Sequence, residues 1–153
     1  MTQFSFERAL RFGDCDPSGI AYFPSYLNIL NGVVEEFWAT IGFPWPALIT
    51  ARKIGTPTVH LSCDFSRPSL FGDLLTFKLR IIKVGRASLH LADAVSGTDS
   101  MRWQARQVVA ATLVNHQAIP WPATFARRYL HICKPTSEPS WKQSLPLCRS
   151  RSS

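Results

Sequence analysis

Alternation of apolar and polar residues predicts several strands. The alternation is imperfect between residues 3 and 12, where we expect an opening strand. It is clearest between residues 74 and 84, where Leu75, Phe77 and Leu79 fall on one face and polar residues on the other. Further strands are expected over residues 58–65, 88–95 and 101–115. Short polar turns join these consecutive strands, which predicts antiparallel pairing.

One segment shows helical periodicity instead. Apolar residues recur at three- and four-residue steps between residues 26 and 41, which predicts a helix with a wide apolar stripe. Pro24 fits the first turn, where its missing N–H costs nothing, and Gly42 and Pro44 end the helix. The prolines in residues 43–55 predict a loop there.

The order of these elements predicts the fold class. A strand, a long helix and four more strands favour a two-layer α+β domain. Because the helix is apolar over much of its circumference, we expect a curved antiparallel sheet of about five strands to wrap around it. This domain is expected to span residues 1–133. Residues 134–153 contain three prolines and six serines, and this composition predicts a flexible basic tail.

Length and composition fit one globular domain. The chain has 153 residues, of which 46% are hydrophobic and 18% charged, and this excludes a wholly disordered chain. It is too short for a TIM barrel, or for a dinucleotide-binding enzyme with a separate substrate domain. The sequence contains no apolar run of about 18 residues, so no transmembrane helix is predicted. The first residues lack the pattern of a signal peptide, so we expect a cytoplasmic protein.

Cysteines and histidines indicate neither a metal site nor a catalytic triad. The four cysteines form no CxxC pair, no histidine falls at zinc-finger spacing, and no histidine accompanies a recognisable nucleophile. We therefore expect reduced thiols and no bound metal.

The charge balance favours an anionic partner. The net charge is +7, from 17 Lys+Arg against 10 Asp+Glu, which suits nucleic acid, anionic lipid or a phosphorylated cofactor. Residues 134–153 carry +3 of this excess, and residues 1–133 carry +4. That modest excess suits a few phosphates better than a nucleic-acid track. The aromatic residues lie mostly at apolar periodic positions rather than between basic residues, which also argues against nucleic acid.

The most informative stretch is residues 11–26, RFGDCDPSGIAYFPSY. Pro17 biases Asp16 towards an extended backbone, Gly19 permits a tight bend, and Pro24 starts the helix. A carboxylate is thus held shortly before a helix N-terminus, whose first N–H groups have no internal partner and which carries the positive end of the helix dipole. This arrangement suits acyl transfer. The N–H groups polarise a carbonyl, and the carboxylate attacks it or activates water. A thioester is a suitable target because its thiolate leaves easily.

Two other interpretations of this turn are open on the residues alone. Asp16 could be an ordinary Asx-turn residue. Asp14 and Asp16 could also bind a metal, although two carboxylates with no histidine nearby are a weak indication.

The stretch FGDCDPSGI, followed by FPSY and a long helix, closely resembles the signature of the 4-hydroxybenzoyl-CoA thioesterase family. Supporting similarity lies at residues 55–59, at residues 73–76 and near Asn115, and the resemblance covers about residues 4–133. It implies the hot-dog fold, in which a sheet wraps a central helix. It also implies that Asp16 is the catalytic carboxylate and that the backbone N–H of Phe23 polarises the thioester carbonyl.

The same resemblance implies a position for the acyl group. Asn31 falls where the 4-hydroxybenzoyl enzyme has an acid that contacts the ring hydroxyl. An amide here weakens the case for 4-hydroxybenzoate, although it could bond another polar substituent or simply face the polar side of the helix. Tyr22, Phe23 and Tyr26 cluster at the helix start, with Trp38 further along. They could line a slot for an aromatic ring or fill the core.

Contacts to the nucleotide of coenzyme A are implied at a basic turn. Lys83, Arg86 and Ser88 lie where the family's nucleotide contacts lie. Arg127 and Arg128, near the end of the domain, could do the same, because coenzyme A carries three phosphates. Each of these residues could equally be an ordinary solvated side chain.

These observations predict an acyl-CoA thioesterase that hydrolyses a small, aromatic, benzoyl-type substrate. A non-hydrolytic module that binds acyl-CoA or an acyl carrier on the same fold is the alternative. The role of Asp16, nucleophile or general base, stays open. No cofactor is expected beyond the coenzyme A of the substrate, and no nucleic-acid or membrane partner. An open sheet edge predicts a homo-oligomer, and the resemblance implies a dimer or tetramer with coenzyme A at a subunit boundary.

Overall fold

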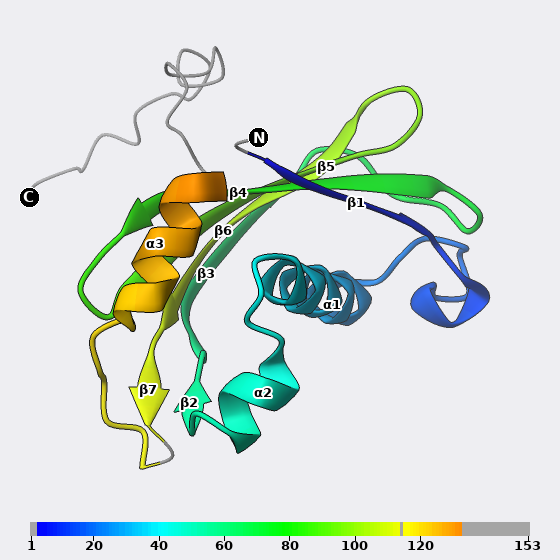
Figure 1. Ribbon diagram of the computed structural model, residues 1–153. Helices are drawn as coiled ribbons and strands as arrows, with labels where there is room; N and C mark the ends of the chain where they lie inside the picture. Colours follow the sequence, from blue (N-terminus) through cyan, green and yellow to red (C-terminus); the bar gives the residue numbers. More distant parts are fainter. Residues whose placement is uncertain (1–2, 114, 133–153) are drawn as a thin grey trace, which may run out of the picture.

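The computed structural model describes residues 3–113 and 115–132, which form one curved sheet with a long helix in its concave side (Figure 1). The helix is α1, Phe23–Thr40. The sheet is antiparallel, with strand order β1-β4-β5-β6-β3. Its strands are β1 (Phe4–Ala9), β4 (Leu74–Val84), β5 (Ser88–Ser96), β6 (Met101–Ala110) and β3 (Thr58–Phe65). The α+β class and the five-stranded sheet wrapped around a helix are confirmed, and this is the hot-dog architecture.

The core lies between α1 and the concave face of the sheet. Every second residue of β4 and β5 points into it, and α1 contributes Val33, Phe37 and Trp38, each at most 2% exposed. The strand register places Phe77 opposite Val95 on this face. Full burial of one such side chain contributes about 1.5–3 kcal/mol. This packing holds α1 against the sheet.

Residues 43–55 do not form the predicted loop. They contain a short helix, α2 (Trp45–Thr50), and a short strand, β2 (Ile54–Gly55). Pro44 is the N-cap of α2 and Pro46 lies in its first turn. Proline is tolerated there because the first N–H groups of a helix have no internal acceptor. The prolines thus start a helix where they were interpreted as loop residues.

Two strand boundaries also differ from the prediction. The opening strand ends at Ala9, and Phe12–Asp14 form a 3-10 turn, η1. The strand predicted over residues 101–115 is divided, because β6 ends at Ala110 and β7 (Thr112–Leu113) leaves the main sheet to pair with β2.

A third helix, α3 (Ala123–Ile132), was not predicted. It extends the core at the C-terminal end of α1. The ring of Phe125 lies 5.5 Å from that of Trp38 and 5.6 Å from that of Phe43. Arg128 donates hydrogen bonds to the carbonyls of Ile41 and Gly42, which directly follow the last residue of α1. The tail predicted over residues 134–153 lies outside the described residues.

Candidate active site

The turn that carries Asp16 is closed by backbone hydrogen bonds. The N–H of Asp16 donates to the carbonyl of Ile20, and the N–H of Gly19 donates to the carbonyl of Asp16, both at 2.9 Å. Gly19 has a φ of +79°, a left-handed conformation that glycine adopts without strain. Cys15 and Ala21 then form an antiparallel bridge across the base of the turn. Asp16 is therefore the first residue of a hydrogen-bonded turn.

Two hydrogen bonds from Ser18 orient the Asp16 carboxylate. The N–H of Ser18 donates to Asp16 Oδ1 at 2.8 Å, and the Ser18 hydroxyl donates to the same oxygen. The hydroxyl and then the N–H of Ser18 lower the pKa of Asp16, because both stabilise the ionised form. The side chain is exposed. It is therefore an ionised and accessible carboxylate at neutral pH, suited to act as nucleophile or base.

Asp14 has a different environment, although it lies only two residues away. Its side chain is buried, and Nη2 of Arg8 lies 3.0 and 3.1 Å from its two oxygens. The N–H of Arg11 also donates to it, at 2.9 Å. Asp14 is thus occupied in holding β1 to the turn. No group of three or more metal-ligating side chains occurs among the residues that the structure describes.

Helix α1 begins at Phe23, next to this turn. The N-cap, Tyr22, makes no side-chain cap hydrogen bond, and Pro24 has no N–H to offer. The Phe23 N–H is one of the first N–H groups of the helix, which have no acceptor within it. With the positive end of the helix dipole, it can polarise a carbonyl oxygen placed there.

A pocket of about 330 Å³ opens beside the start of α1. Its walls come from the turn that carries Asp16, from α1 and from the end of β3 with the loop that follows it. The lining residues are Ile20, Ala21, Phe23, Tyr26, Phe65, Ser66, Arg67 and Pro68. They are mostly apolar, and three carry aromatic rings. The pocket thus has the character of a small-molecule site.

The wall formed by residues 65–68 was not identified from the sequence. The N–H groups of Ser66 and Arg67 both donate to the carbonyl of Arg102. The guanidinium of Arg102 in turn lies 3.1 Å from the carboxylate of Asp73. Residues distant in sequence thus build this wall, and no local pattern indicated it.

The aromatic residues proposed for the acyl slot separate into two groups. Phe23 and Tyr26 line the pocket, and Tyr22 lies next to them, 43% exposed. The Tyr26 hydroxyl accepts a hydrogen bond from the N–H of Ser69 at 3.2 Å, which fixes its ring at the pocket wall. Trp38, in contrast, is 1% exposed and packs against Phe125. The suggestion that Trp38 lines the slot is wrong, and its interpretation as a core residue is confirmed.

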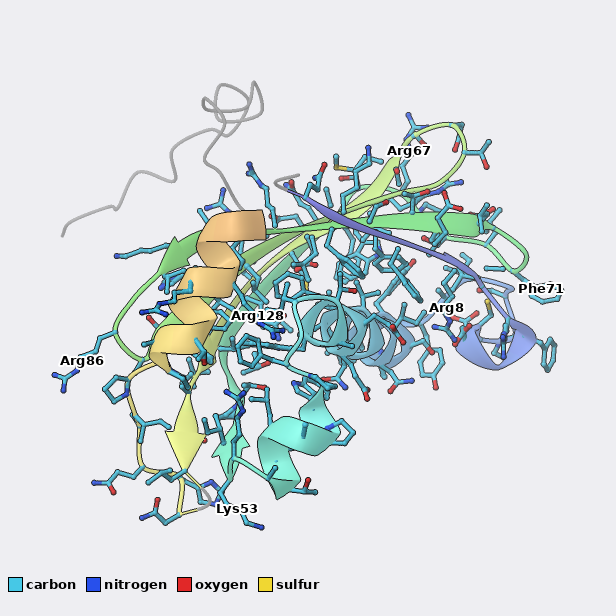
Figure 2. The ribbon with its side chains drawn as sticks, in the orientation of Figure 1. Arg8, Lys53, Arg67, Phe71, Arg86 and Arg128 are labelled. Atoms are coloured by element: carbon cyan, nitrogen blue, oxygen red, sulfur yellow. The ribbon has the colours of Figure 1, made fainter. Side chains whose placement is uncertain are left out.

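The predicted nucleotide contacts lie at the far end of the sheet. Lys83, Arg86 and Ser88 lie at the hairpin that joins β4 to β5. The turn that carries Asp16, in contrast, adjoins the beginning of β4. Figure 2 shows Arg86 at one end of the molecule, and Arg8 and Phe71 at the other. The ten residue steps of β4 correspond to roughly 33 Å. Within one chain the structure does not bring these residues to Asp16.

The remaining candidates have separate locations. Arg127 is exposed on α3, and Arg128 from the same helix (Figure 2) bonds the carbonyls of the two residues that follow α1. Asn31 is exposed two turns into α1. Cys15 and Cys63, the cysteines within the described residues, are free thiols. No helix in the described part of the chain is long and apolar enough to span a membrane.

Comparison with known proteins identifies the family of this chain. The sequence model of the thioesterase-like superfamily matches residues 10–129. The chain is 33% identical to a 1,4-dihydroxy-2-naphthoyl-CoA hydrolase of Synechococcus elongatus over 87 residues, 56% of this chain and 64% of that relative. It is 33% identical to the 4-hydroxybenzoyl-CoA thioesterase of Pseudomonas sp. strain CBS-3 over 94 residues, 60% of this chain and 67% of that one. The chain thus spans less than two thirds of the Synechococcus relative.

Solved structures show the same fold. The 4-hydroxybenzoyl CoA thioesterase of the Pseudomonas strain superposes with a TM-score of 0.78 at 25% identity, covering 84% of this chain and 99% of that one. A 1,4-dihydroxy-2-naphthoyl-CoA thioesterase from Synechocystis gives a TM-score of 0.78 at 20% identity, covering 87% and 99%. A central helix wrapped by a curved antiparallel sheet defines a protein of the hot-dog fold. The chain belongs to the thioesterase-like superfamily.

Proposed function

We propose that this protein is an acyl-CoA thioesterase that hydrolyses a compact aromatic acyl-CoA to the free acid and coenzyme A. The observation that carries this proposal is the position of Asp16, an ionised and exposed carboxylate on the turn that leads to the Phe23 N–H of α1 and contributes Ile20 and Ala21 to a ring-lined pocket. The relatives named for aromatic acyl-CoA substrates support the same class of substrate. The proposal needs no cofactor beyond the coenzyme A of the substrate, and it places the enzyme in the cytoplasm.

In this mechanism the acyl ring lies against Phe23, Tyr26 and Phe65, and the thioester carbonyl oxygen accepts a hydrogen bond from the Phe23 N–H. As the carbonyl carbon is attacked, negative charge develops on that oxygen and is stabilised by the helix N-terminus. The C–S bond breaks and coenzyme A leaves as a thiolate.

Asp16 can promote attack on the carbonyl carbon in two ways. As a nucleophile it forms a mixed anhydride with the acyl group, and water then hydrolyses the anhydride to release the acid and restore the carboxylate. As a general base it removes a proton from a water that attacks directly. A single turnover in ¹⁸O-labelled water distinguishes them, since hydrolysis of an anhydride at the Asp16 carbonyl transfers the label to Asp16, whereas direct attack by water labels only the product acid.

Hydrolysis is tested by following thiol release from a panel of acyl-CoA esters. Turnover that disappears in Asp16→Asn supports the proposal. Binding of acyl-CoA without any thiol release favours the alternative, a non-hydrolytic binding module on the same fold.

We also propose that the working enzyme is a homo-oligomer, at least a dimer, built on the edge strand β3. This strand is eight residues long, and its apolar residues Val59, Leu61 and Phe65 are 61%, 36% and 50% exposed. An exposed apolar edge is a template for pairing with another chain. A two-fold axis that pairs β3 with its own copy reverses the strand direction. The β4–β5 hairpin of one protomer then lies at the catalytic-turn end of the other.

This arrangement gives the distant basic residues a role. In it, Lys83, Arg86 and Ser88 of one protomer, with Arg127, approach the coenzyme A phosphates of a substrate bound at Asp16 of its partner. Size-exclusion chromatography with light scattering tests the oligomer. A stable species at the monomer mass of 17.2 kDa at micromolar concentration would contradict it.

A further inference from the structure

Asp93 occupies an unusual position on the concave face of the sheet. Leu89, Leu91, Asp93 and Val95 are all buried at alternate positions of β5, so the carboxyl lies on the face that packs beneath α1. In the strand register it stands between Leu79 of β4 and Ala105 of β6. The sequence pattern contains this information, since Asp93 has the same parity as its apolar neighbours, but the residue was not singled out.

The carboxyl of Asp93 has no hydrogen-bond partner within the described residues. The residue is 2% exposed, and both of its oxygens are buried. Burial raises the pKa of this carboxyl to about 7. Buried polar groups are nearly always hydrogen-bonded because an unpaired one is costly. A carboxyl kept in this state therefore calls for a partner that the described residues do not supply.

Two further unpaired polar groups lie next to it. Gln107 and Trp103 on β6 are its diagonal neighbours on the same face, at positions that lie roughly 7–8 Å apart in an antiparallel pair. The amide nitrogen of Gln107 donates to the Thr58 hydroxyl, but Oε1 of Gln107 and the indole N–H of Trp103 are buried without a partner in the described chain. The group thus presents three acceptor oxygens and one donor. A hydroxyl group, which both donates and accepts, matches this set.

The polar group formed by Asp93, Gln107 and Trp103 lies next to the pocket. Asp93 is two residues further along the strands than the residues that contact the pocket wall, a step called one layer here. The ring of Trp103 is 5.4 Å from that of Tyr26 and 5.8 Å from that of Phe65, and both of these residues line the pocket. Two residues further along each strand, on the same face, are Ala105 and the half-buried Cys63. These small side chains lie in the same row across the strands as Asp93. One layer is two residues of strand, roughly 7 Å, which is comparable to the length of a benzoyl group.

We propose that Asp93 is a specificity-determining residue that accepts a hydrogen bond from a hydroxyl on the acyl group of the substrate. With Gln107 beside it, Asp93 selects hydroxylated aromatic acyl groups over the same rings without the hydroxyl. This inference rests on the proposed function, because it takes the ring-lined pocket to be the acyl site. A site built to pair a substrate hydroxyl discriminates strongly against the analogue that lacks it, since the buried oxygens then stay unpaired.

The test measures binding without turnover. Dissociation constants are measured by calorimetry in the Asp16→Asn background for two matched pairs, 4-hydroxybenzoyl- against benzoyl-CoA and 1,4-dihydroxy-2-naphthoyl- against 2-naphthoyl-CoA. We expect at least one hydroxylated ligand to bind about tenfold more tightly than its partner. Adding Asp93→Leu should abolish that preference while leaving the affinity for the unhydroxylated ligand within about threefold. Adding Asp93→Asn, which keeps the shape and one acceptor oxygen, should reduce the preference in part.

The control is Asp64→Leu, which removes an exposed carboxyl from the opposite face of the sheet and should leave the preference unchanged. Circular dichroism checks that each variant folds. Should Asp93→Leu not fold, the Asn variant decides. Equal binding within both pairs, no binding of any ligand, or a preference that survives replacement of Asp93 would overturn the inference. A preference that depends on Asp93, without thiol release from any ester by the unmodified enzyme, supports this inference and contradicts the proposed hydrolysis.

Discussion

Nη2 of Arg8 lies within 3.1 Å of both carboxylate oxygens of Asp14, whose side chain is buried, while Asp16 two residues later points into solvent. The two acids of the GDCD stretch therefore differ in availability. Asp14 is committed to an ion pair and to the N–H of Arg11. Within the described part of the chain, the carboxylate of Asp16 bonds only to Ser18 of its own turn. Asp14 therefore shapes the turn, whereas the carboxylate of Asp16 is available to react.

The first prediction concerns these two acids. Asp16→Asn should reduce turnover by at least about 100-fold, the scale typical of losing a general base, because the amide keeps the shape but lacks the charge. Asp14→Asn should mainly lower the free energy of unfolding, by about 1–3 kcal/mol, because it weakens a buried hydrogen-bonded pair. Steady-state kinetics and urea unfolding measure the two effects. An inactive Asp14→Asn enzyme beside a near-normal Asp16→Asn enzyme would reverse the assignment.

The second prediction concerns the pH dependence set by Ser18. The hydroxyl and N–H of Ser18 hold the pKa of Asp16 below its usual range, so the reactive carboxylate persists to lower pH than an ordinary aspartate. Ser18→Ala removes the hydroxyl donor and keeps the N–H. The acid limb of the kcat/KM profile should move to higher pH, while the rate at pH 8 changes little. Ser62→Ala, on the exposed edge strand, is the control and should leave the profile in place.

Local patterns predicted most of the fold because one face of the sheet is buried. Strands β3 and β4 occupy the predicted residues, and α1 begins and ends within a residue or two of its predicted limits. The prolines were harder to interpret. Pro44 and Pro122 lie at the beginnings of α2 and α3, and the same residue type that ends one helix can start another.

The candidate site was predictable only in its local part. Asp16 and the start of α1 lie within one short stretch, so the turn chemistry was visible in the sequence. The pocket wall at Phe65 depends on the pairing of β3 with β6, and the isolation of Asp93 depends on what covers it. Both are long-range properties of the packed sheet. The separation of Arg86 from Asp16 likewise follows from the length of β4.

The third prediction concerns stability and Asp93. Its pKa of about 7 in the folded protein lies above the unfolded value of about 3.9, so the folded state holds this proton more tightly. Proton binding by Asp93 therefore adds its full contribution to the free energy of unfolding below about pH 4. This contribution falls between pH 4 and pH 7, and above pH 7 it changes no further. Asp93→Asn removes that decline. The difference in unfolding free energy between Asn variant and parent should rise by up to about 4 kcal/mol from pH 4 to pH 8.

Urea unfolding at several pH values measures this difference, with Asp64→Asn as an exposed control that should track the parent. A difference between Asp93→Asn and parent that is independent of pH would show that Asp93 has an ordinary pKa in the folded state.

The fourth prediction concerns Gly42, where α1 ends and α3 docks. Its φ of +81° is unfavourable for other residues, and an added Cβ would overlap the guanidinium of Arg128. Gly42→Ala should therefore cost about 1–2 kcal/mol in stability. Gly32→Ala is the matched control, because Gly32 lies within α1 and its added Cβ would meet nothing within 4 Å. Replacing this glycine inside the helix by alanine should raise the free energy of unfolding by about 0.5–1 kcal/mol. Thermal unfolding that shifts both variants in the same direction would contradict this account.

The fifth prediction concerns the acyl group. The pocket of about 330 Å³ is walled by the rings of Phe23, Tyr26 and Phe65, and the Tyr26 ring is fixed by its hydrogen bond to Ser69. Flat rings favour a ring, since stacking adds about 0.5–1.5 kcal/mol beyond the burial of area. A long acyl chain needs an extended tunnel, and the rings that wall this compact pocket leave little room for one. Specificity constants for benzoyl-, substituted benzoyl- and phenylacetyl-CoA should therefore exceed that for palmitoyl-CoA, with thiol release as the assay. Phe65→Ala should lower the specificity constants for the aromatic esters and so bring them closer to that for palmitoyl-CoA. Phe12→Ala alters an exposed ring outside the pocket and should leave these constants unchanged. A tenfold preference for palmitoyl-CoA would exclude the aromatic slot and leave the assignment of Asp16 intact.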